Sequence, residues 1–114
     1  MEVRMTSLDE LHRQYRHSLA GKRDDLRKAW GALCDEAASA AQVAHLHLLL
    51  HRLAGSAGTY GYPDIARRAK ALEQAWTAWL AQAQEDRAAP YSICAGQAGG
   101  MLDLLDALQV VERT

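Results

Sequence analysis

Apolar residues recur at three- and four-residue steps along almost the whole chain, and no stretch alternates apolar and polar residues with a period of two. Steps of three and four bring side chains to one face of an α-helix, whereas a strand requires the two-residue period. The sequence therefore predicts an all-α protein. A chain of 114 residues is long enough to bury one hydrophobic core, so we expect a single domain over residues 1–114.

Start and stop signals divide the chain into five helices. Two capping boxes, in which a serine is followed three residues later by Glu or Gln, open the first helix at Ser7 and the third at Ser39. Gly21 predicts a break between the first and second helices, and Pro63 suits the first turn of the fourth. The third helix should end within the glycine-rich residues 58–61.

A polar linker over residues 84–90 precedes the last helix, whose start is weakened by the glycines at 96, 99 and 100. Each helix offers one apolar face to a common core. The expected core residues are Leu8, Leu11, Tyr15, Leu19, Leu26, Trp30, Leu33, Ala37, Leu46, Leu49, Leu50, Leu53, Ala57, Ile65, Ala69, Leu72, Trp76, Trp79, Ala83, Met101, Leu104, Leu105, Leu108 and Val111. Short connections between the four main helices predict an antiparallel up-down four-helix bundle, with the additional short N-terminal helix packed as a cap.

Charge and composition exclude several classes of partner. The formal net charge is −1, and no concentrated basic patch suggests binding to nucleic acid or to an anionic membrane. Cys34 and Cys94 lack the spacing of a disulfide framework or a zinc site, so we expect small core residues in a reducing compartment. Residues 1–10 are charged and contain no apolar signal region, and the longest apolar stretch, near Leu48, is too short to span a bilayer. We therefore expect a cytoplasmic protein, and separately we expect it to be a monomer.

The residue types around His51 suit a histidine that another protein must reach. The chain reads His-Arg-Leu-Ala-Gly-Ser-Ala-Gly-Thr-Tyr-Gly-Tyr from His51 onward. On a helix, the positions beside His51 on its own face are 47, 48, 54, 55 and 58, which include two glycines and one alanine. The apolar stripe of this helix lies nearly opposite. The imidazole should therefore point into solvent, with open space on its C-terminal side.

This run, together with Ile65, Ala69 and the pair Leu72-Glu73, resembles the signature of histidine-containing phosphotransfer (HPt) domains, including the phosphoacceptor domains of chemotaxis histidine kinases. The close match covers residues 46–76. The resemblance implies that His51 accepts a phosphoryl group from the aspartate of a response-regulator receiver domain and passes it on. It also implies a phosphoryl carrier with no kinase activity of its own, whose partners are receiver domains or hybrid histidine kinases. Such a carrier has no cofactor of its own, because the receiver supplies Mg²⁺.

One position departs from the family pattern. Many HPt domains carry a lysine three residues after the histidine, where this chain has Ala54. The departure leaves open an alternative, a degenerate HPt-like module that binds a receiver or kinase without being phosphorylated.

A hairpin folded about Tyr62 should bring together residues equally distant from it. His51 lies eleven residues before Tyr62 and Glu73 eleven after, so the Glu73 carboxylate is expected to accept the Nδ1 proton of His51 and leave Nε2 free to attack. The alternative for Glu73 is a solvated helix residue. Ala54 and Lys70 are each eight residues from Tyr62, so Lys70 is a candidate substitute for the absent lysine, unless it is merely solvated.

The surroundings of His51 suggest a surface for a partner. The expected partner-binding residues are Leu48, Arg52, Ala54, Gly55 and Arg67. The alternative interpretation is that Leu48 is a single exposed leucine of the ordinary kind and that the arginines are ordinary solvated cations.

Two other kinds of site are not expected. The histidines at 45, 47 and 51 include an i, i+4 pair that suits zinc, but a structural zinc site needs four ligands, so we predict no metal. The Gly-Ser-Ala-Gly run follows a helix instead of a strand and therefore does not predict a nucleotide-binding loop.

Overall fold

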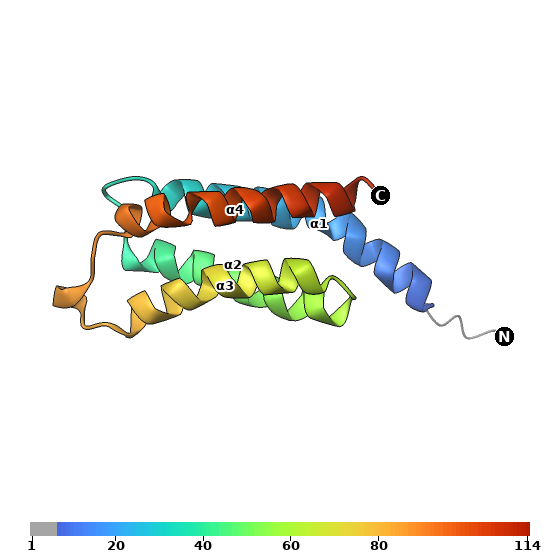
Figure 1. The fold of residues 1–114 in the computed structure, drawn as a ribbon, viewed down its shortest axis with the longest axis horizontal. Helices are drawn as coiled ribbons and strands as arrows, with labels where there is room; N and C mark the ends of the chain where they lie inside the picture. The colour runs from blue at the N-terminus through green and yellow to red at the C-terminus, as the bar shows by residue number, and fades with distance from the viewer. Residues whose placement is uncertain (1–6) are drawn as a thin grey trace.

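The computed structural model describes residues 7–114 and shows four long helices in an antiparallel bundle (Figure 1). The helices are α1 (Leu8–Leu33), α2 (Ala40–Thr59), α3 (Pro63–Ala81) and α4 (Pro90–Glu112), with a short 3₁₀ turn, η1 (Gln84–Asp86), between the last two. Each helix packs against its neighbours in the order α1, α2, α3, α4, and α4 closes the bundle against α1. No strand occurs within residues 7–114. The all-α four-helix bundle predicted from the sequence is therefore confirmed.

The expected short first helix does not exist as a separate element, because α1 runs without a break through Gly21. Tyr15, Leu19 and Leu26, on both sides of this glycine, are buried in the same core. A glycine inside a helix costs about 1 kcal/mol, whereas burying one leucine contributes about 1.5–3 kcal/mol. Packing therefore carries the helix through Gly21. The N-terminal part of α1 extends past the end of the bundle at the α2–α3 connection (Figure 1).

The predicted capping residues begin their helices as expected. At α1, the Glu10 amide donates to Ser7 Oγ at 3.1 Å. At α2, the Gln42 amide donates to Ser39 Oγ at 3.3 Å, and the Ser39 amide donates to Gln42 Oε1 at 2.7 Å, which completes the capping box. These bonds satisfy amides that the helix itself leaves without acceptors.

The connection between α2 and α3 consists of residues 60–62 only. Gly61 has a φ of +84°, a conformation that residues with a side chain rarely adopt. Tyr60 and Tyr62 both stack on Tyr15 of α1, which fixes this turn against the first helix. A turn this short makes α2 and α3 antiparallel neighbours and so fixes which of their residues face one another.

Three other expected helix ends differ from the structure. Ala37 and Ala83 lie beyond the ends of α1 and α3 and are exposed. The last helix begins at Pro90, before its glycines, and contains all three of them. A Cβ on Gly100 would lie 3.3 Å from Cδ2 of Leu72, so this glycine permits the close approach of α3 and α4. Five further core predictions are wrong in degree, since Leu8 is exposed and four other residues are only half-buried: Leu11, Trp30, Leu49 and Val111.

The two cysteines occupy different environments. Cys94 on α4 is buried, whereas Cys34 at the end of α1 is exposed, so the prediction that both are core residues is wrong for Cys34. Both line one shallow pocket of about 280 Å³ together with Trp30 and Tyr91. Burial, and secondarily the neighbouring Cys34 thiol, raise the pKa of Cys94 to about 12. A neutral, buried thiol of this kind is a poor nucleophile.

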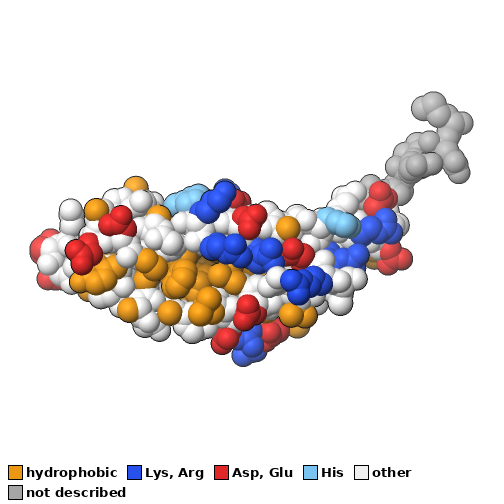
Figure 2. Space-filling model, turned by 90° about the horizontal axis from the view of Figure 1, so that it is seen from above, with side chains coloured by type: hydrophobic (Ala, Val, Ile, Leu, Met, Phe, Trp, Pro, Cys, Tyr) orange, Lys and Arg blue, Asp and Glu red, His pale blue; other side chains and the backbone are white. Residues whose placement is uncertain are grey.

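The outer surface over α1 and α4 is mixed in character. Figure 2 shows hydrophobic side chains on the half of this face that is farther from the N-terminus, and side chains of both charges interleaved elsewhere. None of the helices within residues 7–114 is both long and apolar enough to cross a membrane. Residues 1–6, which belong to the charged segment noted in the sequence, lie outside the described part of the chain.

Candidate functional site

His51 projects from the middle of α2 toward solvent. Its side chain is 68% exposed. The opposite side of the helix is buried in the bundle by Leu46, Leu50, Leu53 and Ala57. The amphipathic pattern of α2 thus presents the imidazole outward while the leucines anchor the helix.

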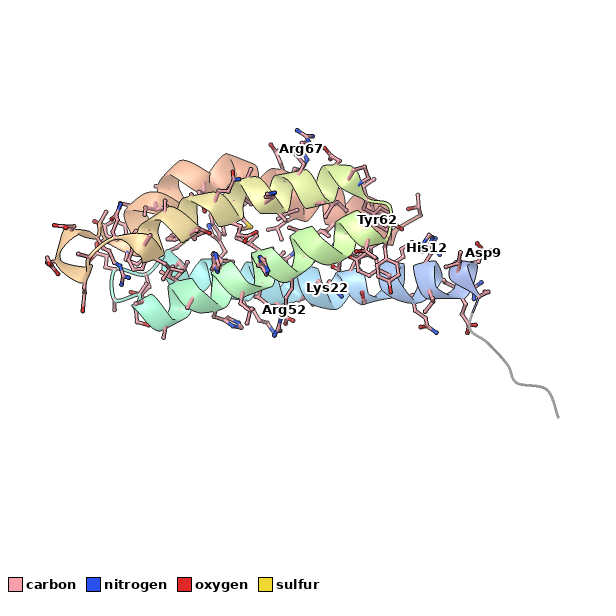
Figure 3. All side chains as sticks on the ribbon, turned by 90° about the horizontal axis from the view of Figure 1, so that it is seen from below. Asp9, His12, Lys22, Arg52, Tyr62 and Arg67 are labelled. Atoms are coloured by element: carbon pink, nitrogen blue, oxygen red, sulfur yellow. The ribbon has the colours of Figure 1, made fainter. Side chains whose placement is uncertain are left out.

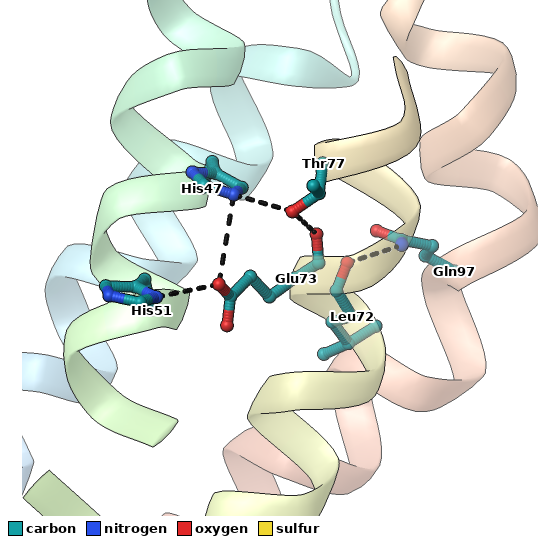
Figure 4. Close-up of polar contacts among 6 residues, drawn as sticks. All are labelled: His47, His51, Leu72, Glu73, Thr77 and Gln97. Atoms are coloured by element: carbon teal, nitrogen blue, oxygen red, sulfur yellow. Dashed lines mark hydrogen bonds and ion pairs between the residues drawn. The ribbon is translucent and has the colours of Figure 1, made fainter. Parts of the chain in front are cut away.

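Glu73 of α3 holds one side of the imidazole. Its Oε1 lies 2.8 Å from Nδ1 of His51, and its side chain is only 15% exposed (Figure 4). An ionised carboxylate only accepts hydrogen bonds, so the proton of a neutral His51 lies on Nδ1. The lone pair of Nε2 then faces away from Glu73 and is available to an external electrophile.

Two more residues join this contact, and the sequence reasoning did not find either role. Nε2 of His47 lies 2.8 Å from Oγ1 of Thr77 and 3.9 Å from Oε1 of Glu73. The Thr77 hydroxyl donates to the backbone carbonyl of Glu73 at 3.1 Å. Figure 4 shows the four side chains meeting between α2 and α3.

A common register explains why these residues meet. His51 and Glu73 are eleven residues before and after Tyr62, and His47 and Thr77 are fifteen before and after it. A Cβ on Gly58 would lie 3.9 Å from that of Ala66, and these two residues are four before and after Tyr62. The same rule of equal distance from Tyr62, applied one helical turn N-terminal to His51, would have placed His47 opposite Thr77.

The immediate surroundings of His51 are open. Gly55, one turn further along α2, is exposed, and a Cβ placed on it would meet no atom within 4 Å. Leu48 is 40% exposed despite its apolar side chain. Arg52 is exposed and lines a pocket of about 260 Å³ with Lys22 and other residues of α1 and α2. A partner approaching His51 would therefore meet an apolar side chain, a cation and a flat glycine surface.

Arg67 lies elsewhere on the hairpin. It forms an ion pair with Asp64, as does Arg68, and lines a pocket between α3 and α4 with Gly100. Hydrogen bonds from Arg68 and Arg67 hold the pKa of the Asp64 carboxyl below its usual range. Figure 3 shows Arg67 and Arg52 projecting from opposite edges of the α2–α3 pair. The structure gives no contact between Arg67 and the residues around His51.

Comparison with known proteins now bears on this arrangement. A family model described as Hpt domain matches residues 10–111, nearly the whole chain. The chain belongs to the Hpt family. Hpt domains are phosphoryl carriers that interact with receiver domains and histidine kinases in phosphorelays. Searches of curated proteins and of solved structures found no significant match.

This Hpt domain lacks a lysine at the position three residues after the histidine. Ala54 occupies that position and packs, half-buried, against the core. Lys70 is exposed, and within the described residues it takes part in none of the ion pairs. It shares the Tyr62-centred register with Ala54, at eight residues on either side.

The histidines of this Hpt domain do not form a recognisable metal site. Among residues 7–114, no group of three or more His, Cys, Asp and Glu side chains has an arrangement that would hold a metal ion. The rings of His47 and His51 lie 6.4 Å apart at an interplanar angle of 11°. Each ring instead uses one nitrogen for a hydrogen bond within the chain. Nε2 of His47 pairs with Thr77, and Nδ1 of His51 pairs with Glu73.

Proposed function

We propose that Nε2 of His51 carries a phosphoryl group between the aspartate of one receiver domain and that of another, or of a hybrid histidine kinase. One observation supports this most directly. The imidazole is 68% exposed, and Glu73 engages its Nδ1 at 2.8 Å, which leaves Nε2 as the free, outward nitrogen. Glu73 acts as a positioning residue, since it touches the reacting ring at the nitrogen that does not react.

His51 and Glu73 together account for every bond and proton in the transfer step. The Nε2 lone pair forms a bond to phosphorus, and the bond from phosphorus to the aspartyl oxygen breaks, with its electron pair leaving on the partner's carboxylate. Nε2 carries no proton to be lost. The ring becomes a phosphorylated imidazolium, and its Nδ1 proton stays within the contact to the Glu73 carboxylate. The negative charge of Glu73 therefore faces the positive charge that develops on the ring. Reversal of the same step delivers the phosphoryl group to the next aspartate.

The partner supplies what this chain lacks for phosphoryl transfer. Transferring a phosphoryl group requires Mg²⁺ and cations around its oxygens, and we assign both to the receiver domain. This chain contributes a positioned nucleophile and has no kinase activity of its own. Its two free cysteines suit the reducing conditions of the cytoplasm, where we place the protein as a monomer.

The docking surface in this proposal is centred on His51. Leu48 and the open surface at Gly55 provide contact area, and Arg52 attracts the carboxylate cluster of a receiver. Lys70 is the candidate for stabilising the phosphoryl oxygens from α3. Arg67, paired with Asp64 at the other edge of the hairpin, is a peripheral contact at most.

The test is transfer from a phosphorylated receiver to the purified chain. The parent should acquire acid-labile, base-stable phosphate, and His51→Gln should acquire none while retaining its helicity. His45→Gln, which changes another exposed histidine of α2, serves as the matched control and should label normally. Labelling of His51→Gln at the parental rate would overturn the site. A parent that binds the receiver but stays unlabelled would instead establish the alternative, an interaction module that is not phosphorylated.

A further inference from the structure

One carboxylate oxygen of Glu73 lies between two histidines. Oε1 is 2.8 Å from Nδ1 of His51 and 3.9 Å from Nε2 of His47. The proposed function uses only the first contact. The His47 side chain is 27% exposed and is therefore more buried than that of His51, which is 68% exposed.

Thr77 determines which way the His47 ring presents its nitrogens. The Thr77 hydroxyl has a single proton, and the structure directs it to the Glu73 carbonyl at 3.1 Å. Oγ1 can then only accept from Nε2 of His47, at 2.8 Å. Nε2 of His47 thus carries a proton, and the N–H group lies near Oε1 of Glu73 as well as Thr77. The His47 ring is therefore held by Thr77, which lies on α3 one turn after Glu73.

The Glu73 side chain needs such a neighbour. A glutamate has several rotatable bonds, and although Glu73 is only 15% exposed, one hydrogen bond to a mostly exposed imidazole does not fix all of them. The His47 ring lies on one side of the carboxylate and nearly parallel to the His51 ring, and Oε1 lies within 4 Å of one nitrogen of each ring. The conformer that meets Nδ1 of His51 is therefore favoured over conformers turned toward the α3 C-terminus.

We propose that His47, held by Thr77, is a second positioning residue of the phosphotransfer site. It fixes the Glu73 carboxylate and, through it, the Nδ1–H tautomer of His51. The inference rests on the proposed function for its consequence, since that tautomer leaves the Nε2 lone pair free. The arrangement itself belongs to the isolated chain and requires no partner.

The decisive measurement is the tautomer of His51 in the free protein, by long-range ¹H–¹⁵N correlation. It is made at about pH 8, where ordinary histidines are neutral. In the parent, the Nδ1–H form should predominate. His47→Leu should shift His51 toward the Nε2–H form, whereas His47→Gln should retain the parental ratio, because its amide can still donate to Thr77. His45→Leu is the matched control and should leave His51 unchanged.

Specific results would overturn the inference. A parental tautomer ratio in a folded His47→Leu variant would do so, and so would failure of His47→Gln to restore the ratio. If His47→Leu does not fold, Thr77→Val removes the acceptor of the same hydrogen bond without altering α2. An unchanged His51 tautomer in that variant would equally contradict the proposal.

The kinetic readout separates this inference from the proposed function. With a phosphorylated receiver, His47→Leu should transfer on the order of fivefold more slowly than the parent, about the effect of one partly solvated hydrogen bond, and His47→Gln should be near the parental rate. If the parent itself acquires no phosphate, the proposed function fails while the tautomer result stands. If the parent labels and His47→Leu labels equally fast, the positioning role fails and the function stands.

Discussion

Replacing Gly55 by glutamine should make the protein more stable and less active at once. Gly55 lies within α2, and a Cβ there would meet no atom within 4 Å, so the larger residue creates no clash within the chain. Glycine to glutamine in a helix gains about 0.5–1 kcal/mol. For a chain of 114 residues, this corresponds to a rise in Tm of about 2–4 °C.

The activity of Gly55→Gln should fall because of where the new side chain goes. Side chains on a helix lean toward its N-terminus, so the residue at 55 extends over the turn that carries His51. A receiver would then have to dock further from Nε2. Displacing reacting atoms by on the order of 1 Å costs up to about a hundredfold in rate, so we expect transfer to slow by about tenfold or more.

Gly99→Gln is the matched control for this experiment. Gly99 is also exposed within a helix with open space around it, but it lies on α4, which packs against α1 and α3. Both variants should gain similar stability in thermal and urea unfolding, and only Gly55→Gln should transfer slowly from the phosphorylated receiver. Equal transfer rates in the two variants would refute the steric argument. A lower Tm for Gly55→Gln would refute the energetic one.

Two more predictions concern the absent lysine and the cysteines. Lys70→Ala should shorten the phosphohistidine lifetime or slow transfer several-fold, because one partly solvated charge contact is worth about 1 kcal/mol. Adding Ala54→Lys to that variant should restore the lost lifetime or rate. Parental values of both in Lys70→Ala would refute the idea that Lys70 replaces the absent lysine. At about pH 8, iodoacetamide should modify Cys34 and leave Cys94 unmodified until the chain is denatured, because burial raises the pKa of Cys94 to about 12. Rapid modification of Cys94 in the native protein would contradict its burial. Because the pKa of Cys94 is higher in the folded chain than in the unfolded chain, only the unfolded chain loses this proton as the pH rises above roughly 8.5, and the free energy of unfolding should fall there.

Much of the site follows from helix geometry and one short turn. The outward direction of His51 comes from the apolar residues on the opposite face of its own helix, and 3.6 residues per turn place those without knowledge of any neighbour. The Glu73 contact follows from the Tyr62-centred register, since a three-residue connection leaves two antiparallel helices little freedom to slide. The first feature lies within one helix, and the second lies within one hairpin with a single short turn.

What the sequence determined by itself is the all-α class, the capped helix starts at Ser7 and Ser39, and the face of α2 that carries His51. What only the tertiary structure decided depends on contacts between distant segments. Gly21 stays helical because the leucines on both sides are buried by other helices, and no local pattern contains that gain. Likewise, the register places His47 opposite Thr77, but which of their atoms meet, and how near they come to Glu73, depends on how the side chains of the two helices pack together. Local propensity is worth about 1 kcal/mol per residue, so packing and shared hydrogen bonds override it wherever they disagree.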